Sequence, residues 1–323
     1  MHIGVIGAGG MGSRHIENLR SIEGIEVTIT DVDLARASEV AGPASVVTED
    51  PYLLIADPSI DGIVIASPDH THADYAIACI EAGKRVLVEK PVAETTHDAQ
   101  MVMETEAATG RRLVQVGFMR EFDPEHEALR TEIERGAIGP PILIRCTHAN
   151  AGAGAPLVDA FIRSAVHDLH TLRFLTNQEI QEVMVHTIAA EGDVGLIRLA
   201  TISCRMDSTL GTIALNLASA YGYDVQVEVT GESGMVRTET PGPRQFITSG
   251  TEDRSISADW LDRFQTAYRR EMQAWIASLS SPQAVGPSTW DGYATVAAAT
   301  ACIESARIGR PVQVELIPRP VAS

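Results

Sequence analysis

Three glycines near the N-terminus have the spacing of a loop that binds a diphosphate. Gly7, Gly9 and Gly12 follow a short apolar run and precede a helical pattern. In such a loop the first glycine allows a tight turn, the second lets a pyrophosphate approach the backbone, and the third permits close packing of helix on strand. The start of the helix adds free N–H groups and partial positive charge. We therefore predict a dinucleotide site whose contacts come from Gly7, Gly9, Gly10, Met11 and Gly12.

An acidic residue stands where such a site requires one. Asp31 ends the second strand-like run, 19 positions after Gly12. A carboxylate there can accept hydrogen bonds from the ribose hydroxyls and would repel the 2′-phosphate of NADP. Positions 10, 32 and 33 carry no Lys or Arg that could receive that phosphate. We therefore expect NAD as the cofactor, and the alternative role for Asp31 is that of a helix N-cap.

A parallel sheet must position these residues, and residues 1–118 have its pattern. Strand-like and helix-like segments alternate, which is typical of βαβ units with helices on both faces of a sheet. The predicted strands are Ile3–Gly7, Glu26–Thr30, Gly62–Ser67, Arg85–Glu89 and Leu113–Gly117. The predicted helices are Met11–Ser21, Asp33–Val40, His72–Ala82 and Thr96–Thr109. We predict an N-terminal NAD-binding Rossmann domain over residues 1–118.

The pattern changes in residues 119–323. Longer β-like runs with short turns between them indicate an antiparallel sheet. The expected strands are Ile142–His148, Glu182–Ala189, Gly195–Arg205, Gly211–Ala220 and Asp224–Gly231, with a glycine-rich loop at Ala149–Pro156. The expected helices are Pro124–Gly136, Ile162–Leu175, Asp262–Leu279 and Gly292–Ile308. The predicted fold class is α/β: a Rossmann domain followed by an α+β domain built on an open, mainly antiparallel sheet.

Composition excludes several classes of partner. The chain has 323 residues and a formal net charge of −18, which disfavours nucleic acid and anionic membrane surfaces. It has no apolar run near the roughly 20 residues of a membrane helix and no signal-type segment at its start. The four cysteines form no C-x-x-C pair, which argues against a zinc site and a disulfide scaffold. We expect buried, reduced thiols in a cytoplasmic protein.

Two further motifs identify a family resemblance. Ser67-Pro68-Asp69-His70-Thr71-His72 follows one predicted strand, and Glu89-Lys90-Pro91 follows the next. Together with the glycine motif they resemble the Gfo/Idh/MocA oxidoreductases, a family named for glucose–fructose oxidoreductase and inositol dehydrogenase. Four stretches are similar to inositol 2-dehydrogenases within that family: 117–124, 221–226, 263–268 and 286–293.

The resemblance implies a catalytic pair. Lys90 would contact the substrate hydroxyl and the nicotinamide end of NAD. His167 matches the family's general base, and an unperturbed imidazole suits a base that works near neutrality. Further cofactor contacts would come from Ser67, Pro68, His72 and Glu89, and Arg120 would lie on the nicotinamide side. The segment Asp69–His72 is expected to be a turn and helix start beside the cofactor, so no metal site is predicted.

The helix that carries His167 departs from the family at two positions. The family has an Asp four residues before the base and another three residues after it. Arg163 and His170 stand there in this chain. A spacing of four on a regular helix would place Arg163 and His167 on one face. Arg163 could bind an anionic substrate group, and His170 could bind a hydroxyl. Alternatively, the chain has lost activity, or Asp159 or Asp168 partly replaces the missing carboxylate, although Asp168 would point away from His167.

Other substrate contacts follow from the same resemblance. They are His148 and Asn150 before the glycine-rich loop, and Tyr221 and Tyr223, of which one is expected to face the substrate. The function implied is an NAD-dependent oxidoreductase that transfers a hydride between a ring hydroxyl of a cyclitol or sugar and the nicotinamide. The alternatives are a dehydrogenase of another sugar, glycoside or anionic sugar derivative bound by Arg163, and a non-catalytic NAD- or sugar-binding sensor. The family's open sheet implies a homodimer or homotetramer.

Overall fold

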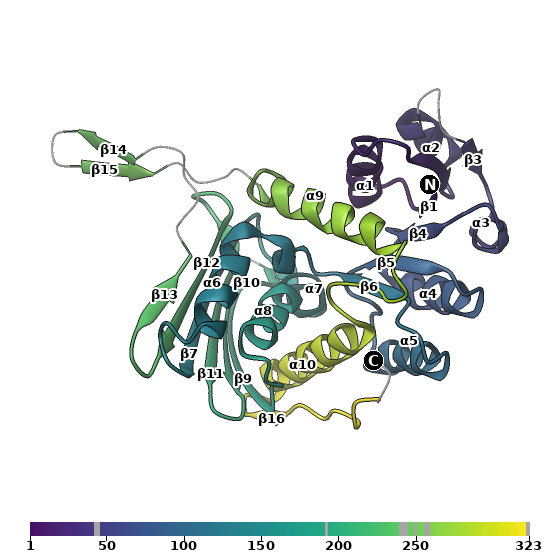
Figure 1. Ribbon diagram of the computed structural model, residues 1–323. Coiled ribbons are helices and arrows are strands. Elements are labelled where there is room, and N and C mark those ends of the chain that lie inside the picture. Colours follow the sequence, from purple (N-terminus) through teal and green to yellow (C-terminus); the bar gives the residue numbers. More distant parts are fainter. Residues whose placement is uncertain (42–45, 191–192, 239–244, 249–250, 255–258, 321–323) are drawn as a thin grey trace. The chain divides into compact units, whose positions relative to one another are not determined.

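The chain forms two compact units in a computed structural model that describes residues 1–41, 46–190, 193–238, 245–248, 251–254 and 259–320 (Figure 1). The first unit comprises Met1–Met119, Tyr268–Val296 and Leu316–Ser323. The second comprises Arg120–Ala267 and Ala297–Glu315. The first unit therefore includes two segments that a single cut of the chain at residue 118 would leave out.

A six-stranded parallel sheet forms the centre of the first unit, in the order β3-β2-β1-β4-β5-β6. Its strands are β1 (His2–Ile6), β2 (Glu26–Thr30), β3 (Val46–Thr48), β4 (Gly62–Ile65), β5 (Arg85–Glu89) and β6 (Val114–Gly117). The strand order reverses between β1 and β4, and ligands bind at the carboxyl ends of strands beside such a switch point. Sequence patterning missed β3 and the short helix α3 (Pro51–Ala56), because three and six residues are too few for a hydrophobic period to repeat clearly.

Helices bury the faces of this sheet. They are α1 (Gly10–Arg20), α2 (Leu34–Ala41), α4 (His72–Glu81) and α5 (Thr96–Ala108). The strands are nearly all buried, as continuous apolar runs in parallel sheets predict. Met272 and Trp275, from the part of α9 (Trp260–Ser278) that belongs to this unit, join the apolar cluster around Val5 and Leu87. That contact explains why residues far along the chain belong to the first unit.

The second unit contains an eight-stranded mixed sheet with the path β13-β12-β7-β11-β10-β9-β16, and β8 pairs with β10. Only the pair β11–β7 is parallel among its described ladders. The strands are β7 (Pro141–Ala151), β8 (Ala155–Pro156), β9 (Glu182–Ala190), β10 (Asp193–Arg205), β11 (Leu210–Ser219), β12 (Asp224–Gly231), β13 (Met235–Arg237) and β16 (Val312–Gln313). The predicted fold class, a Rossmann sheet followed by a mainly antiparallel sheet, is confirmed.

Local details differ from the prediction. The loop expected at Ala149–Pro156 is partly wrong, because β7 continues to Ala151 and β8 pairs with β10 through Pro156 and Leu196. The strands β14 (Gln245–Thr248) and β15 (Thr251–Arg254) form a separate hairpin that patterning also missed. Strands of two to four residues leave too little periodicity to recognise.

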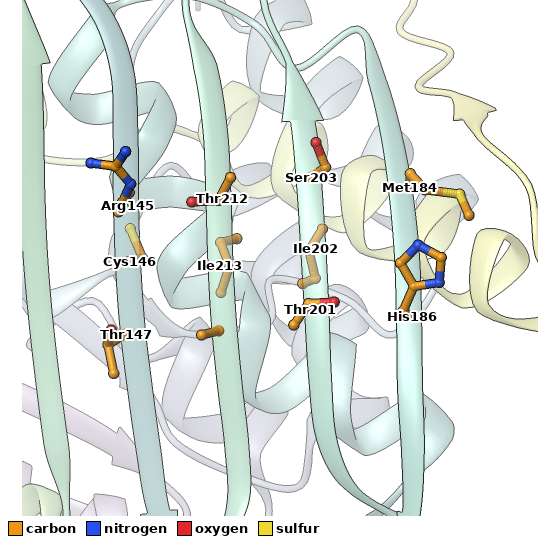
Figure 2. A pocket seen from close by; sticks show the side chains of 11 residues that line it. Arg145, Cys146, Thr147, Met184, His186, Thr201, Ile202, Ser203, Thr212 and Ile213 are labelled. Atoms are coloured by element: carbon orange, nitrogen blue, oxygen red, sulfur yellow. The ribbon is translucent and has the colours of Figure 1, made fainter.

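One face of the large sheet is covered by α6 (Pro124–Glu134), α8 (Val166–Thr176) and the later part of α10 (Thr289–Ile308) (Figure 1). The backbone N–H of Val185 donates to Ser305 Oγ at 3.0 Å, which fixes α10 on β9. The opposite face is exposed and contains a hollow of about 300 Å³ over β7, β9, β10 and β11 (Figure 2). Side chains lining it include Arg145, Thr147, His186, Thr201, Ser203 and Thr212.

Candidate active site

The glycine motif forms the turn that joins β1 to α1. Gly7 has a φ of +99°, a conformation that side chains other than glycine rarely adopt. A Cβ atom on Gly12 would lie 1.9 Å from the carbonyl oxygen of Gly7, so helix and strand can pack this closely only with glycine. A Cβ on Gly9 or Gly10 would meet nothing within 4 Å. The space beside Gly9 and Gly10 at the N-terminus of α1 is therefore open, and the contacts of this turn with a diphosphate stay a prediction.

Asp31 is fixed beside this turn. Its Oδ2 accepts from the backbone N–H of Ala8 at 2.6 Å, and its Oδ1 accepts from the N–H of Asp33 at 2.8 Å. Burial alone would raise the pKa of Asp31, but these N–H groups and the Arg36 guanidinium lower it. The carboxylate is therefore held ionised at the end of β2, where the ribose of a dinucleotide binds.

Arg36 is a contact that sequence reasoning missed. Its Nη2 lies 2.6 Å from Asp31 Oδ1, and its side chain is 45% exposed. Positions 10, 32 and 33 carry no cation, whereas Arg36 reaches the carboxylate from the first turn of α2. The sequence could have indicated this contact, because α2 begins shortly after the end of β2 and its first turn lies over that strand end.

Lys90 belongs to a loop that buried side chains hold at both ends. On one side, Glu89 Oε2 accepts from the backbone N–H of Lys90 at 3.2 Å, and Glu89 Oε1 lies 2.7 Å from His15 Nε2. Burial raises the pKa of Glu89, but its hydrogen bond with His15 and the nearby positive charges outweigh that effect and lower it. His15 lies on α1, one turn after the glycine motif, and was not singled out from the sequence.

The other end of this loop is held through His72. The peptide bond between Lys90 and Pro91 is cis. The His72 ring places Nδ1 2.7 Å from the carbonyl oxygen of Pro91 and Nε2 2.9 Å from that of Ser67. His72 is 1% exposed, so it joins the loops after β4 and β5. Ser67 and Pro68 lie at the carboxyl end of β4, and their contacts with the cofactor stay predictions.

The helix around His167 is not regular. It begins as α7 (Leu157–Asp159), continues as a π-helical turn over Ala160–Ala165, and becomes α8 only at Val166. The helix predicted at Ile162–Leu175 is therefore present, but it begins with π-helical and not α-helical geometry. Arg163 lies in the π-helical turn, so the spacing of four that places two residues on one α-helical face does not apply to Arg163 and His167.

Arg163 and His167 also differ in their solvent exposure. The Arg163 side chain is 53% exposed and its Nε lies 3.8 Å from Asp159 Oδ1. His167 is only 8% exposed. Single π-turns within helices occur frequently at functional sites, where they reorient side chains. The turn presents Arg163 to solvent and keeps His167 largely buried.

Asp168 takes part in a buried cluster that we name the His148 trio, which consists of Arg120, His148 and Asp168. Arg120 Nη1 donates to Asp168 Oδ1 at 2.6 Å, and His148 Nδ1 lies 2.6 Å from Asp168 Oδ2. Burial raises the pKa of Asp168, but Arg120 and His148 lower it to well below its usual range. Both oxygens of Asp168 thus have partners other than His167, and one of these partners is a different predicted substrate residue.

A second cluster has the same composition, and we name it the His126 trio: Arg263, Asp123 and His126. His126 Nδ1 lies 2.6 Å from Asp123 Oδ2, and Arg263 donates to both oxygens of Asp123 at 2.8 and 3.1 Å. Burial raises the pKa of Asp123, but its two partners lower it to well below its usual range. Asp123 and Arg263 lie in the stretches 117–124 and 263–268 that resemble inositol 2-dehydrogenases, but no sequence pattern predicts their contact across 140 positions.

The remaining predicted substrate residues have diverse surroundings. His170 Nε2 lies 2.8 Å from Glu121 Oε1, and the ring stacks on Phe174 with centroids 6.4 Å apart. Tyr223 is buried, packs edge-on against His148 at 5.7 Å, and has its pKa raised to about 12 by burial. Tyr221 is 52% exposed. Tyr223 is therefore the tyrosine that the structure brings to His148.

Asn150 stands two residues after His148 on β7, so strand alternation places both on the same face of the sheet.

In the part of the chain that the structure describes, no group of three His, Cys, Asp or Glu residues could hold a metal ion. None of the helices formed by these described residues has the length and hydrophobicity of a membrane span.

Comparisons with known proteins agree along the whole chain. The profile of an oxidoreductase family with an NAD-binding Rossmann fold matches residues 1–118, and that of the GFO/IDH/MocA C-terminal domain matches residues 126–237. Inositol 2-dehydrogenase 1 of Saccharopolyspora erythraea is 39% identical over 99% of this chain and 98% of its own length. The inositol 2-dehydrogenase of Rubrobacter xylanophilus is 40% identical over 98% and 94%.

Solved structures give the same result. The myo-inositol dehydrogenase of Lactobacillus casei, in complex with NAD(H) and myo-inositol, superposes with a TM-score of 0.94 at 27% identity, over 100% of this chain and 99% of that one. The scyllo-inositol dehydrogenase of the same organism, with bound NAD(H) and scyllo-inositol, gives 0.89 at 25% identity, over 97% and 99%.

Proposed function

Because the chain belongs to the Gfo/Idh/MocA family of NAD-binding oxidoreductases, we propose that it dehydrogenates one ring hydroxyl of a cyclitol such as inositol. The observation that carries this proposal is the 39% identity with an inositol 2-dehydrogenase along 99% of the chain. The NAD site supports it, because the open space at Gly9 and Gly10 and the ionised Asp31 fit a dinucleotide without a 2′-phosphate.

The reaction removes a hydride and a proton from a carbinol and leaves a ketone. NAD, when bound, supplies the acceptor for the hydride. The family resemblance implies that His167 takes the hydroxyl proton and that Lys90 stabilises developing negative charge through its ammonium group. The carbinol carbon loses its hydride and becomes a ketone, so the products are a cyclic ketone, NADH and one proton. The buried Glu89–His15 pair and His72 hold the loop that carries Lys90.

The role of His167 is tested by its change to alanine. We expect the rate of NAD reduction with myo-inositol to fall by about 10²–10⁴-fold, because a general base contributes that much. NAD binding, measured by calorimetry, should remain within about twofold of the wild type. An unchanged rate would exclude His167 as the base.

Asp31 and Arg36 allow a test of cofactor choice that needs no substrate. Asp31→Ser removes the carboxylate that accepts from the ribose and leaves the Arg36 guanidinium near the 2′ position. We expect weaker NADH binding and stronger NADPH binding in a fluorescence titration, by about tenfold each. The gain for NADPH should disappear in Asp31→Ser/Arg36→Ala, and its persistence there would exclude Arg36 as the phosphate contact.

Arg163 supports a second candidate substrate class, the anionic sugar derivatives. Its side chain is 53% exposed on a π-helical turn, at a position where the family resemblance implies an aspartate. A guanidinium can bind a carboxylate or phosphate through two parallel hydrogen bonds. Rates with myo-inositol, other sugars and sugar acids, compared between the wild type and Arg163→Asp, separate the classes. Binding of NAD without turnover of any of them would favour a non-catalytic sensor.

The exposed face of the large sheet supports a homo-oligomer. Ile188 and Leu210 are 56% and 53% exposed there, and the hollow in Figure 2 lies on the same face. The family resemblance implies that a second copy of the chain covers such a sheet. Ala214→Arg, in the middle of β11, should shift the mass measured by light scattering toward the monomer, while Glu134→Arg on α6 should leave it unchanged.

The four buried free cysteines fit a cytoplasmic location.

A further inference from the structure

We propose that Asp168 is a positioning residue of the dehydrogenase site, because it fixes the His148 ring so that Nε2 can accept a hydrogen bond from a substrate hydroxyl. This inference rests on the proposed function and on the predicted contact of His148 with substrate. The sequence suggests Asp168 only as a replacement for a carboxylate beside His167. The structure gives this carboxylate a different partner, His148.

The contacts of Asp168 determine its charge. The side chain is fully buried and receives two short hydrogen bonds, one to each oxygen, from Arg120 Nη1 and His148 Nδ1, both at 2.6 Å. Arg120 is itself 2% exposed, and burial lowers the pKa of its guanidinium, but Asp168 raises that pKa by more, so the guanidinium keeps its positive charge next to the carboxylate. Burial raises the pKa of Asp168, and the contacts with Arg120 and His148 lower it further than burial raises it. The carboxylate is therefore ionised and can only accept hydrogen bonds.

An ionised Asp168 sets the position of the proton on His148. Because Asp168 Oδ2 can only accept, Nδ1 of His148 must carry the hydrogen of their 2.6 Å contact. Arg120 Nη2 lies 3.4 Å from the same Nδ1, and since both atoms are donors, that contact is not a hydrogen bond. In a neutral imidazole with its proton on Nδ1, Nε2 has a lone pair that can accept. This fixed tautomer is what an approaching hydroxyl needs.

The backbone holds the ring in place as well. His148 lies on the central strand β7, paired with Leu215 of β11 and Val225 of β12. Tyr223 packs edge-on against the imidazole. Asp168 follows the proposed base His167 directly on α8, so the same helix presents the base and the residue that orients His148. A change at Asp168 should therefore affect catalysis through His148 and not only through stability.

A double-mutant cycle tests this route. We would measure kcat and KM for myo-inositol with saturating NAD in the wild type, Asp168→Asn, His148→Ala and the double variant. Asp168→Asn alone should lower kcat/KM by about 10–100-fold, the size expected for one charge-assisted hydrogen bond. In the His148→Ala background it should cause no further loss beyond about twofold. A full additional loss in that background would overturn the proposal.

The His126 trio provides the matched control. Asp123→Asn removes an equally buried carboxylate that contacts an arginine and a histidine. It should lower the melting temperature about as much as Asp168→Asn does, but leave kcat/KM within about twofold. Equal catalytic losses in both variants would mean that Asp168 acts only through stability, and the proposal would fail.

Nitrogen NMR of the wild-type imidazoles decides the tautomer even if Asp168→Asn does not fold. His148, assigned with a His148→Gln variant, should carry its hydrogen on Nδ1 alone. A hydrogen on Nε2, or on both nitrogens, would overturn the proposal.

If the wild type reduces no NAD with any cyclitol or sugar, the proposed function fails. The double-mutant cycle is then measured through the dissociation constant of myo-inositol. Absence of inositol binding as well would overturn both.

Discussion

The His148 trio and the His126 trio have the same composition and nearly the same geometry, but different surroundings. In each, a histidine Nδ1 lies 2.6 Å from an aspartate oxygen and an arginine contacts the same carboxylate. Both guanidinium groups lie against the ring of Phe264, with centroid distances of 5.7 Å for Arg120 and 4.4 Å for Arg263.

The difference lies in the elements that carry them. The His148 trio joins α8, which carries His167, to the strand that carries Asn150. In the His126 trio, Asp123 immediately precedes α6, His126 lies in the first turn of that helix, and Arg263 comes from α9. The same buried contacts can therefore stabilise a helix start in one place and orient a substrate contact in another. Composition and burial alone do not distinguish a functional cluster from a structural one.

The largest effect should come from removing either arginine. Arg120→Met and Arg263→Met each leave a buried carboxylate without its cation, which costs about 3–5 kcal/mol of the free energy of unfolding. Urea denaturation measures this loss, and we expect similar values for both variants. Only Arg120→Met should also lower kcat/KM, when assayed at a temperature where both variants are folded. A catalytic loss in Arg263→Met would remove the distinction between the trios.

How much of the fold the sequence predicts depends on how far apart along the chain the residues of each pattern lie. Gly7, Gly12 and Asp31 were recognised because the glycine spacing and the end of β2 lie within one βαβ unit. The large sheet was recognised from alternating runs, although its register and its parallel pair β11–β7 were not. The parallel pair arises because β7 and β11 are brought together across more than 50 positions of chain, which no local pattern encodes.

The candidate site shows the same limit. Lys90 and His167 followed from motifs, but their buried supports did not. Asp168 and Arg120 are 48 positions apart, and His15 and Glu89 are 74 apart. Such pairs form only when distant elements pack together. The π-helical turn at Ala160–Ala165 was also missed, because its residues have no composition that separates them from an ordinary helix.

A smaller effect should follow from changing the ring that both trios share. Phe264→Leu keeps most of the apolar volume but removes the aromatic face, which should cost about 1–2 kcal/mol. If the ring couples the trios, the losses caused by Asp123→Asn and Asp168→Asn should deviate from additivity in the wild type and add in Phe264→Leu. Additive losses in both backgrounds, measured by denaturation, would show that the two clusters are independent.

The smallest effect is a pH dependence that belongs to the His126 trio. Burial lowers the pKa of His126, more than its contact with Asp123 raises it. A histidine whose pKa is lower in the folded state than in the unfolded chain binds fewer protons when folded. Its contribution to stability is complete above the unfolded pKa of about 6.5 and decreases as pH falls through that value toward the folded pKa.

A variant without this imidazole should therefore lose part of the pH dependence. Melting temperatures of the wild type and His126→Asn, measured from neutral to mildly acidic pH, should converge as pH falls below about 6.5. The convergence should precede the main acid transition, in which Asp123 and Asp168, whose pKa values are both lowered, become protonated. Parallel curves would mean that His126 binds protons equally in the folded and unfolded states. Burial would then have no effect on the pKa of its ring.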